Sequence, residues 1–579
     1  MSAAGRRPLL GLLVAGLGFA ALAVAGLPAF YESFLYLIFS WIALATSWSF
    51  LSGYAGYFSF GHGAFFGAGM YTTAALTTML GVPFLATLPL AGVLAAALGA
   101  GIGAVVFRVK RLRGELFGLL TLAVGFVLAT IVLNTRIDGG PGVYLSAVPL
   151  PRLLASPTGT LYLLGLALAV VTVGAAWVIV HSRLGLGLYA IHDDEDVAEL
   201  EGVPTLSYKL IAFALSAGVA GVAGGIHAMY VSYVTVGETF SITVPLYVVL
   251  MSVLGGARHW LGPAVGATII ASSLYVFTGG QQAVLGRALV ALVLILVILL
   301  LPEGIVPALL ARWRRWRPRP AVALAGPAAA PVVATGPAAT LACEDVWRAF
   351  GGIQALRGVS LAVAPGEIVG LVGPNGSGKT TLINVISGYY APDRGRVTLG
   401  TETLTERPAH QVARLGVGRT HQIPRPFAHL TVLDNVAVAA TFGAGGATPA
   451  QARAEARDWL AFTGLDRRAT ALPHALNLHE RKFLELARAL AGRPRVILLD
   501  EVLSGLNPAE IASAIRLIQQ IRARGVAILF VEHLIRAVLE LSDRVVVLNE
   551  GEVIAAGSPQ EAMRAERVVE VYLGKAHVA

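Results

Sequence analysis

The chain has 579 residues, a formal net charge of +9, one cysteine, and charged side chains at only 13% of its positions. Its mean hydropathy of +0.72 lies far above that of soluble globular proteins, in which about a quarter of the residues are charged. The single Cys343 excludes an intrachain disulfide, and the composition argues against a wholly soluble protein.

Residues 1–310 are predicted to form a multi-pass α-helical membrane domain. Arg6 and Arg7 precede an apolar run that reaches about Phe30, which is too long for a signal-peptide core and predicts a first spanning helix. Segments of about 20 apolar residues predict about ten spans. The candidates are 8–30, 33–53, 56–80, 84–107, 116–135, 158–181, 208–234, 242–257, 262–279 and 284–302.

Basic residues between these spans predict the orientation, because Lys- and Arg-rich loops stay in the cytoplasm. The markers are Arg6 and Arg7, the loop 108–113, the loop near Arg183, and the arginines within 312–319. An even number of spans separates each pair of markers, so both ends of the domain are expected inside. The basic and aromatic 312–319 cluster predicts contact with membrane lipid rather than nucleic acid.

The segment Gly53–Phe65 is dense in glycine and carries Ser59 and His62 at membrane depth. One interpretation is an interrupted helix that lines the translocation path. The other is a tight helix–helix contact with a hydrogen-bonded histidine. The residues alone do not decide between them, and no ligand role is assigned to His62.

The long acidic loop 182–209 is predicted to contain a short amphipathic helix that ends at Gly202. Such a helix suits docking onto a soluble domain, and a solvated loop is the alternative. The residues expected to make the contact are Ala198, Glu199 and Gly202.

The membrane half resembles the permease subunits of branched-chain amino acid ABC importers. The resemblance rests on Gly53–Phe65, Leu112–Thr121, Gly139–Gly142, Gly185–Gly202 and Gly255–Pro263, which occur in the family's order. It implies a transport function and favours docking of the acidic loop onto an ATPase. It does not identify the substrate.

Residues 311–340 are predicted to be a basic, Pro- and Ala-rich linker, and 341–579 an α/β domain with a phosphate-binding loop. The loop matches G-x-x-x-x-G-K-[ST], in which glycines let backbone N–H groups cradle phosphates, the lysine reaches the β- and γ-phosphates, and the threonine holds Mg²⁺. The predicted nucleotide-binding residues are Gly373, Pro374, Asn375, Gly376, Ser377, Gly378, Lys379, Thr380 and Thr381.

A second motif, Val496–Glu501, is an apolar strand that ends in two carboxylates. Asp500 is predicted to bind Mg²⁺, together with Thr380. Glu501 is predicted to orient and deprotonate the attacking water. The two motifs in this order predict a P-loop NTPase.

This half resembles an ABC ATPase, the ATP-binding partner of the same importer family. The resemblance implies that Phe350 stacks on adenine, that Gln422 contacts Mg²⁺ and faces the permease, and that His533 acts near the γ-phosphate. Its signature departs from the family's L-S-G-G-Q pattern at Asn477, Leu478, His479 and Glu480. Bulky residues at the glycine positions hinder close backbone approach to a phosphate.

The sequence therefore predicts a permease–ATPase fusion that imports branched-chain or related amino acids or small amides with ATP and Mg²⁺. The expected partners are an external binding protein and a second permease and ATPase, in a heterodimer, and the expected location is a bacterial-type inner membrane. The alternatives are an ABC exporter half-transporter and a nucleotide-dependent scaffold that does not transport.

Overall fold

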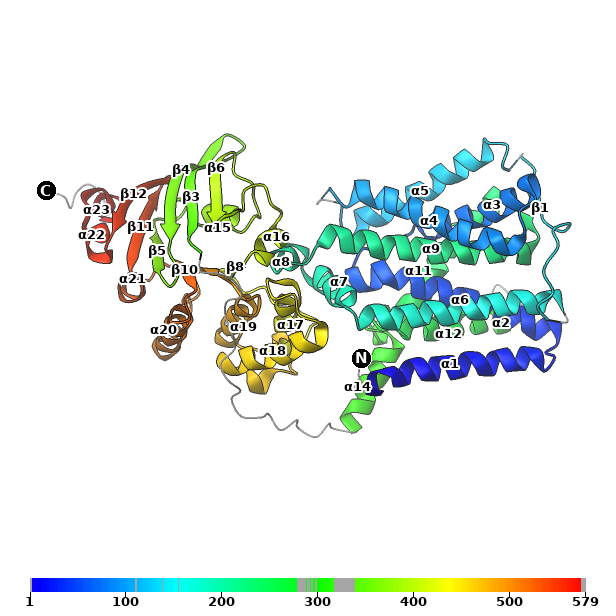
Figure 1. The fold of residues 1–579 in the computed structure, drawn as a ribbon. Coiled ribbons are helices and arrows are strands. Elements are labelled where there is room, and N and C mark those ends of the chain that lie inside the picture. Colours follow the sequence, from blue (N-terminus) through cyan, green and yellow to red (C-terminus); the bar gives the residue numbers. More distant parts are fainter. Residues whose placement is uncertain are drawn as a thin grey trace. The chain divides into compact units, whose positions relative to one another are not determined.

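The computed structural model describes residues 3–109, 112–138, 140–154, 156–278, 288, 292, 295–296, 299–316 and 339–573. The chain divides into two compact units. The helical unit comprises Met1–His192 and Leu206–Val322, and the α/β unit comprises Asp193–Thr205 and Ala323–Ala579 (Figure 1).

The helical unit is built from long apolar helices joined by short connections. Within the described residues, seven segments are long and apolar enough to cross a membrane. The helices are α1 (Ala3–Val24), α2 (Ala29–Trp48), α3 (His62–Leu80), α4 (Phe84–Val106), α5 (Glu115–Leu133), α6 (Pro157–Val180), α7 (Arg183–Asp193), α9 (Thr205–Val231), α10 (Val236–Thr239), α11 (Thr243–Gly255), α12 (Gly262–Thr278) and α14 (Ile305–Trp316).

Each span predicted before residue 280 overlaps one of these helices. The span predicted at 284–302 lies largely outside the described residues. The span predicted at 56–80 begins later, at His62, because α2 continues as a π-helix over Ser49–Gly53 and the chain then leaves helical geometry. The structure therefore places a helix break inside the glycine-dense segment.

Glycines bring the backbones of α3 and α9 into direct contact. A Cβ at Gly69 would lie 1.9 Å from the carbonyl oxygen of Gly221, and one at Gly224 would lie 2.0 Å from that of Phe66. Such spacing excludes any larger residue. Such close packing of small residues is expected between membrane helices, because the hydrophobic effect does not drive helices together in lipid.

The helix α14 crosses the domain boundary predicted at residue 310, since it runs to Trp316. Leu309 and Trp313, one turn apart, are 62% and 58% exposed. The Pro- and Ala-rich part of the predicted linker, 317–338, lies outside the described residues.

The α/β unit contains a six-stranded sheet in the order β12-β11-β5-β10-β9-β8 and a four-stranded sheet in the order β4-β3-β6-β7. Strands β11, β5, β10, β9 and β8 are parallel, and β12 pairs antiparallel at the edge. The strands are β3 (Leu341–Phe350), β4 (Ile353–Val363), β5 (Ile368–Val372), β6 (Arg394–Leu399), β7 (Glu402–Thr403), β8 (Val417–Arg419), β9 (Val496–Asp500), β10 (Ala527–Val531), β11 (Arg544–Asn549) and β12 (Glu552–Gly557).

The central strands β5, β9 and β10 are buried along their whole length, as expected of parallel strands covered on both faces. Cys343 on β3 is 2% exposed, and burial raises the pKa of its thiol to about 12. The helices of this unit are α8 (Glu195–Leu200), α15 (Lys379–Ile386), α16 (Ala409–Arg414), α17 (Val432–Phe442), α18 (Pro449–Phe462), α19 (Leu478–Ala491), α20 (Pro508–Arg522), α21 (Ile535–Leu541), α22 (Pro559–Arg564) and α23 (Glu566–Leu573).

Candidate nucleotide site and coupling segment

The parallel strands bring the predicted nucleotide-site residues to one edge of the sheet. β10 lies between β5 and β9, and β8 lies beside β9. The phosphate-binding loop follows β5, the two carboxylates end β9, His533 follows β10, and Gln422 follows β8. The carboxyl ends of parallel strands are where open α/β sheets bind ligands.

The loop between β5 and α15 has the geometry of a phosphate cradle. Gly376 and Gly378 have φ of +81° and +105°, which other residues rarely adopt. The ammonium of Lys379 donates to the carbonyl oxygens of Gly373 at 2.8 Å and Pro374 at 2.9 Å. Thr380 on α15 is exposed. Backbone N–H groups at a helix N-terminus then favour an anion at this position.

Burial shifts the pKa of two charged groups at this edge of the sheet, Asp500 and Lys379. Asp500 is 2% exposed, and burial raises its pKa although Arg419 opposes the shift. Burial likewise lowers the pKa of Lys379, against the nearby charges of Glu501 and Asp500. One hydroxyl, Thr380, and one carboxylate, Asp500, make an oxygen donor set that suits Mg²⁺ shared with nucleotide phosphates.

Glu501 connects two of the other predicted residues. Its Oε2 accepts a hydrogen bond from the side-chain amide of Gln422 at 2.8 Å. Its Oε1 lies 2.8 Å from Nε2 of His533. The structure thus brings the three predicted catalytic side chains into contact.

Phe350 lies at the end of β3, 38% exposed. Its ring packs edge-on against Tyr390 with centroids 5.0 Å apart, and the guanidinium of Arg348 lies 4.9 Å from its centroid. An exposed ring held from behind in this way can stack on a flat base.

The altered signature forms the start of α19. Asn477 caps this helix, since its Oδ1 accepts the backbone N–H of Glu480 at 2.8 Å, and Glu480 Oε2 accepts the N–H of Asn477 at 3.0 Å. Leu478 is 47% exposed, and the ring of His479 packs on Phe483 with centroids 4.2 Å apart. The departure from the family pattern therefore preserves the helix N-terminus and adds bulk to its first turn.

The acidic segment Asp193–Thr205 belongs to the α/β unit, although helical-unit residues flank it in the sequence. Its first residues make charged contacts there. Asp193 Oδ1 lies 2.7 Å from Nδ1 of His429, and Asp193 Oδ2 accepts the backbone N–H of His429 at 2.8 Å. Asp194 lies 2.5 Å from the guanidinium of Arg425.

The three residues predicted to make the docking contact are all placed in this segment. Ala198 is fully buried, and Glu199 lies 3.8 Å from Nδ1 of His410. Gly202 has φ of +95°, and a Cβ there would lie 2.3 Å from the carbonyl oxygen of Phe442. Both the conformation and the space at this position require glycine.

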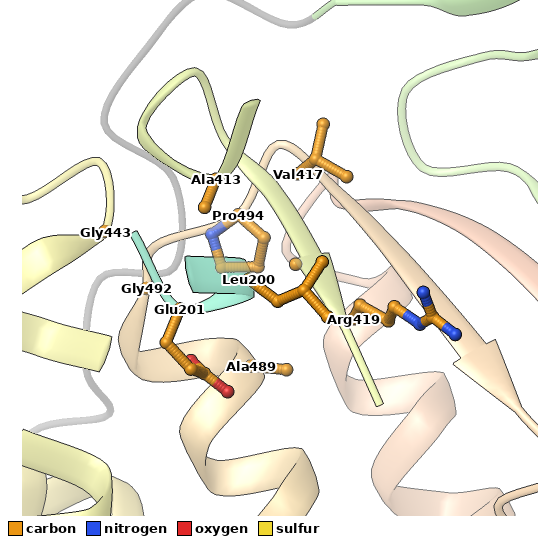
Figure 2. A pocket seen from close by; sticks show the side chains of 10 residues that line it. Leu200, Glu201, Ala413, Val417, Arg419, Gly443, Ala489, Gly492 and Pro494 are labelled. Atoms are coloured by element: carbon orange, nitrogen blue, oxygen red, sulfur yellow. The ribbon is translucent and has the colours of Figure 1, made fainter. Parts of the chain in front are cut away.

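A buried ion pair that the sequence did not predict joins this segment to α19. Arg488 has no exposed side-chain surface, and its guanidinium contacts Glu201 at 2.7 Å and Glu485 at 3.0 Å. Figure 2 shows a recess of the α/β unit that Leu200 and Glu201 help to line. The recess is also lined by Ala413, Val417, Gly418, Arg419, Gly443, Ala489, Gly492 and Pro494.

Comparisons with known proteins agree with this architecture. Residues 30–300 match the family described as "Branched-chain amino acid transport system / permease component", and residues 356–504 match the family "ABC transporter". The ATP-binding protein LivG of Salmonella typhimurium, named for high-affinity branched-chain amino acid transport, is 38% identical over 41% of this chain and 98% of its own length. The chain belongs to the branched-chain amino acid ABC transporter family, as a permease fused to an ATP-binding subunit.

Two further proteins are similar to the α/β unit of this transporter. The lipopolysaccharide export system ATP-binding protein LptB of Acidithiobacillus ferridurans is 38% identical over 40% of this chain and 96% of its own length. A solved nucleotide-free ATP-binding cassette from an ABC transporter is 30% identical over 41% of this chain and 100% of its own, with a TM-score of 0.38. The transporter hydrolyses ATP to drive transport, and its α/β unit is cytoplasmic.

The glycine-dense segment of the transporter is tightly packed. A Cβ at Gly53 would lie 2.2 Å from the carbonyl oxygen of Ala257. His62 is 1% exposed, with Nε2 3.2 Å from the hydroxyl of Ser47, while its Nδ1 has no hydrogen-bond partner among the described residues. The segment therefore combines a helix break with close packing, and a role in the translocation path stays a prediction.

His192, which precedes the segment Asp193–Thr205, and Lys209, four residues after its end, both contact the helix break before His62. A Cβ at Gly56 would lie 3.2 Å from the ring of His192, which ends the helical unit's first part. Lys209, near the start of α9, donates to the hydroxyl of Tyr57 at 3.0 Å.

Replacement of Gly56 by valine is expected to lower transport at least about tenfold. Gly56 has φ of +76°, so a β-branched side chain is strained there by a few kcal/mol and must also displace His192. The measurement is uptake into proteoliposomes together with ATP hydrolysis. Gly101→Val on α4, where a Cβ meets nothing within 4 Å, is the matched control; wild-type uptake by Gly56→Val would contradict the prediction.

Proposed function

We propose that the chain imports branched-chain or related amino acids, or small amides, that an external binding protein delivers. The observation that carries this proposal is the match of residues 30–300 to the branched-chain amino acid permease family, on the same chain as the nucleotide site. The relatives of the α/β unit serve both an amino acid transport system and an export system. The proposed direction of transport and the proposed substrate class are therefore inferred from the permease match of residues 30–300.

In the proposed reaction Lys379 and the backbone of the phosphate-binding loop hold the nucleotide phosphates, and Phe350 stacks on the base. Thr380 and Asp500 would hold Mg²⁺, which offsets phosphate charge when bound. Glu501 accepts the proton of the attacking water. Gln422 and His533 fix the carboxylate of Glu501 in place, since both contact it at 2.8 Å.

The site is proposed to need a second ATPase for completion. The start of α19 would face a nucleotide held by the partner, where helix N-terminal amides stabilise phosphate charge. In this chain Leu478 and His479 add bulk at that point. The proposal is a heterodimer in which an unaltered partner signature completes the Lys379 site and the altered signature completes a less active one.

The test is ATP hydrolysis by the purified chain alone and by the chain co-expressed with the neighbouring permease and ATPase subunits. We expect the chain alone to hydrolyse ATP at least about tenfold more slowly, because oriented donors at a transition-state charge contribute roughly 10²-fold or more each. Equal rates would exclude the unequal pair.

An exporter is the second candidate, since an export-system ATPase is among the relatives. It is distinguished by uptake into right-side-out membrane vesicles of the bacterial inner membrane, where we place the transporter. Uptake that requires the external binding protein supports import. Substrate extrusion without that protein supports export, and nucleotide binding with no turnover supports a scaffold.

A further inference from the structure

The turn between β9 and α20 holds the main chain of Glu501 in an unfavourable conformation. Glu501 has φ of +49°, in the left-handed region that non-glycine residues seldom occupy. Its backbone N–H donates to the carbonyl oxygen of Val531 at 2.9 Å. A residue in this region persists only where its surroundings hold it, and such strain is concentrated at functional sites.

Lys482 holds this turn from the side of α19. Its side chain is 4% exposed, and its ammonium donates to the carbonyl oxygens of Glu501 at 2.9 Å and Ser504 at 2.6 Å. Those two carbonyls bracket the turn. A buried ammonium is costly unless its N–H groups are paired, so these bonds are favoured over a disordered turn.

Glu532 holds the same turn from the side of β10. It is 3% exposed, and its Oε1 accepts the backbone N–H of Leu503 at 2.7 Å. Burial raises the pKa of Glu532 to about 7, while the Leu503 N–H and the charge of Lys482 act in the opposite direction. Glu532 directly precedes His533, so the same strand end carries both the turn's acceptor and the imidazole that contacts Glu501.

We propose that Lys482 and Glu532 are positioning residues for ATP hydrolysis, which fix the Glu501–Ser504 turn from opposite sides. The hydrogen bonds described above reach main-chain groups of the turn and not the carboxylate of Glu501. They determine where the carboxylate of Glu501 lies by fixing its main chain. The inference rests on the proposed catalytic role of Glu501 and does not depend on the transported substrate.

The test is steady-state ATP hydrolysis by the full-length transporter over a range of ATP concentrations. Lys482→Met keeps the aliphatic stem and removes the donors. We expect its kcat to fall by about 10- to 100-fold, since a displacement of about 1 Å can cost 10²-fold, while KM for ATP changes less than about twofold. Arg516→Met, an exposed cation on α20, is the control and should match wild type.

Two further variants separate positioning from a general effect on folding. Lys482→Arg keeps the donors and should recover most of the lost kcat, whereas Glu532→Ala should lose kcat as Lys482→Met does. Thermal unfolding and binding of a fluorescent ATP analogue are measured on each. Wild-type kcat in Lys482→Met and Glu532→Ala, or parallel loss of ATP binding and kcat with no recovery in Lys482→Arg, would overturn the proposal.

The result also distinguishes this inference from the proposed catalytic role. If Glu501→Gln hydrolyses ATP at the wild-type rate, the role of Glu501 as the base fails. If Glu501→Gln is inactive and Lys482→Met is fully active, only the positioning role of Lys482 fails.

Discussion

The Glu501→Gln variant is expected to bind ATP as tightly as wild type and to hydrolyse it at this chain's site at least about 100-fold more slowly, because a positioned general base contributes 10²- to 10⁴-fold. Glutamine keeps the shape of the side chain and its contacts with Gln422 and His533, yet its amide cannot take a proton from water. Hydrolysis is measured in a complex whose partner ATPase carries its own inactivating substitution. Transport should fall in proportion to hydrolysis.

The control for this experiment is Glu540→Gln, the same change on the exposed face of α21. It should hydrolyse ATP and transport as wild type does. Normal uptake by Glu501→Gln in the disabled-partner complex would assign the base to another group. Loss of ATP binding in that variant would instead show that Glu501 contributes to the binding of ATP and not only to its hydrolysis.

Local motifs predicted the nucleotide site because its residues are adjacent to strand ends. The P-loop follows β5 and Asp500 ends β9, so an alternation of buried strands and helices is enough to place them at one edge. The α/β fold class followed from the same motifs, whereas the membrane fold class followed from the apolar segments and the family from resemblance. The roles of Phe350, Gln422 and His533 came from resemblance and stay predictions, while the structure shows that Gln422 and His533 contact Glu501.

Contacts between distant residues could not be predicted in this way. Glu201 and Arg488 are 287 positions apart. From its neighbours in the sequence, each charged side chain would be expected to lie in solvent. Lys482 likewise lies on a helix, α19, in which no local motif marks it. The helix break before His62 was missed at its position because glycine density alone does not show where helical geometry ends.

The Glu201→Lys variant is expected to hydrolyse ATP but to transport at least about tenfold more slowly per ATP. It places a second cation against Arg488, which is fully buried and contacts Glu201 at 2.7 Å. Breaking a buried ion pair costs about 3–5 kcal/mol, and 1.4 kcal/mol corresponds to a tenfold change in an equilibrium. The segment Asp193–Thr205 should therefore lose its place on α19.

The control is Glu402→Lys, the same charge reversal at an ion pair of the α/β unit outside the segment Asp193–Thr205. Glu402 lies 3.1 Å from Arg407, and the two side chains are 43% and 39% exposed, so the loss of this pair is expected to cost at most about 1 kcal/mol. Transport and hydrolysis are measured together in proteoliposomes. Coupled transport by Glu201→Lys at the wild-type ratio would show that the ion pair only stabilises the fold.

The double variant Glu201→Lys, Arg488→Glu tests whether the charge pair itself carries the coupling. Wild type places one cation between two carboxylates, Glu201 and Glu485. The exchange again leaves one cation and two carboxylates, so the net charge of the cluster is unchanged. We expect the double variant to transport more efficiently per ATP than either single variant, and a double-mutant cycle gives the interaction energy. Strictly additive losses would mean that the two residues act independently, and the segment Asp193–Thr205 would then have to be held by its other contacts, such as that of Gly202 with Phe442 at the end of α17.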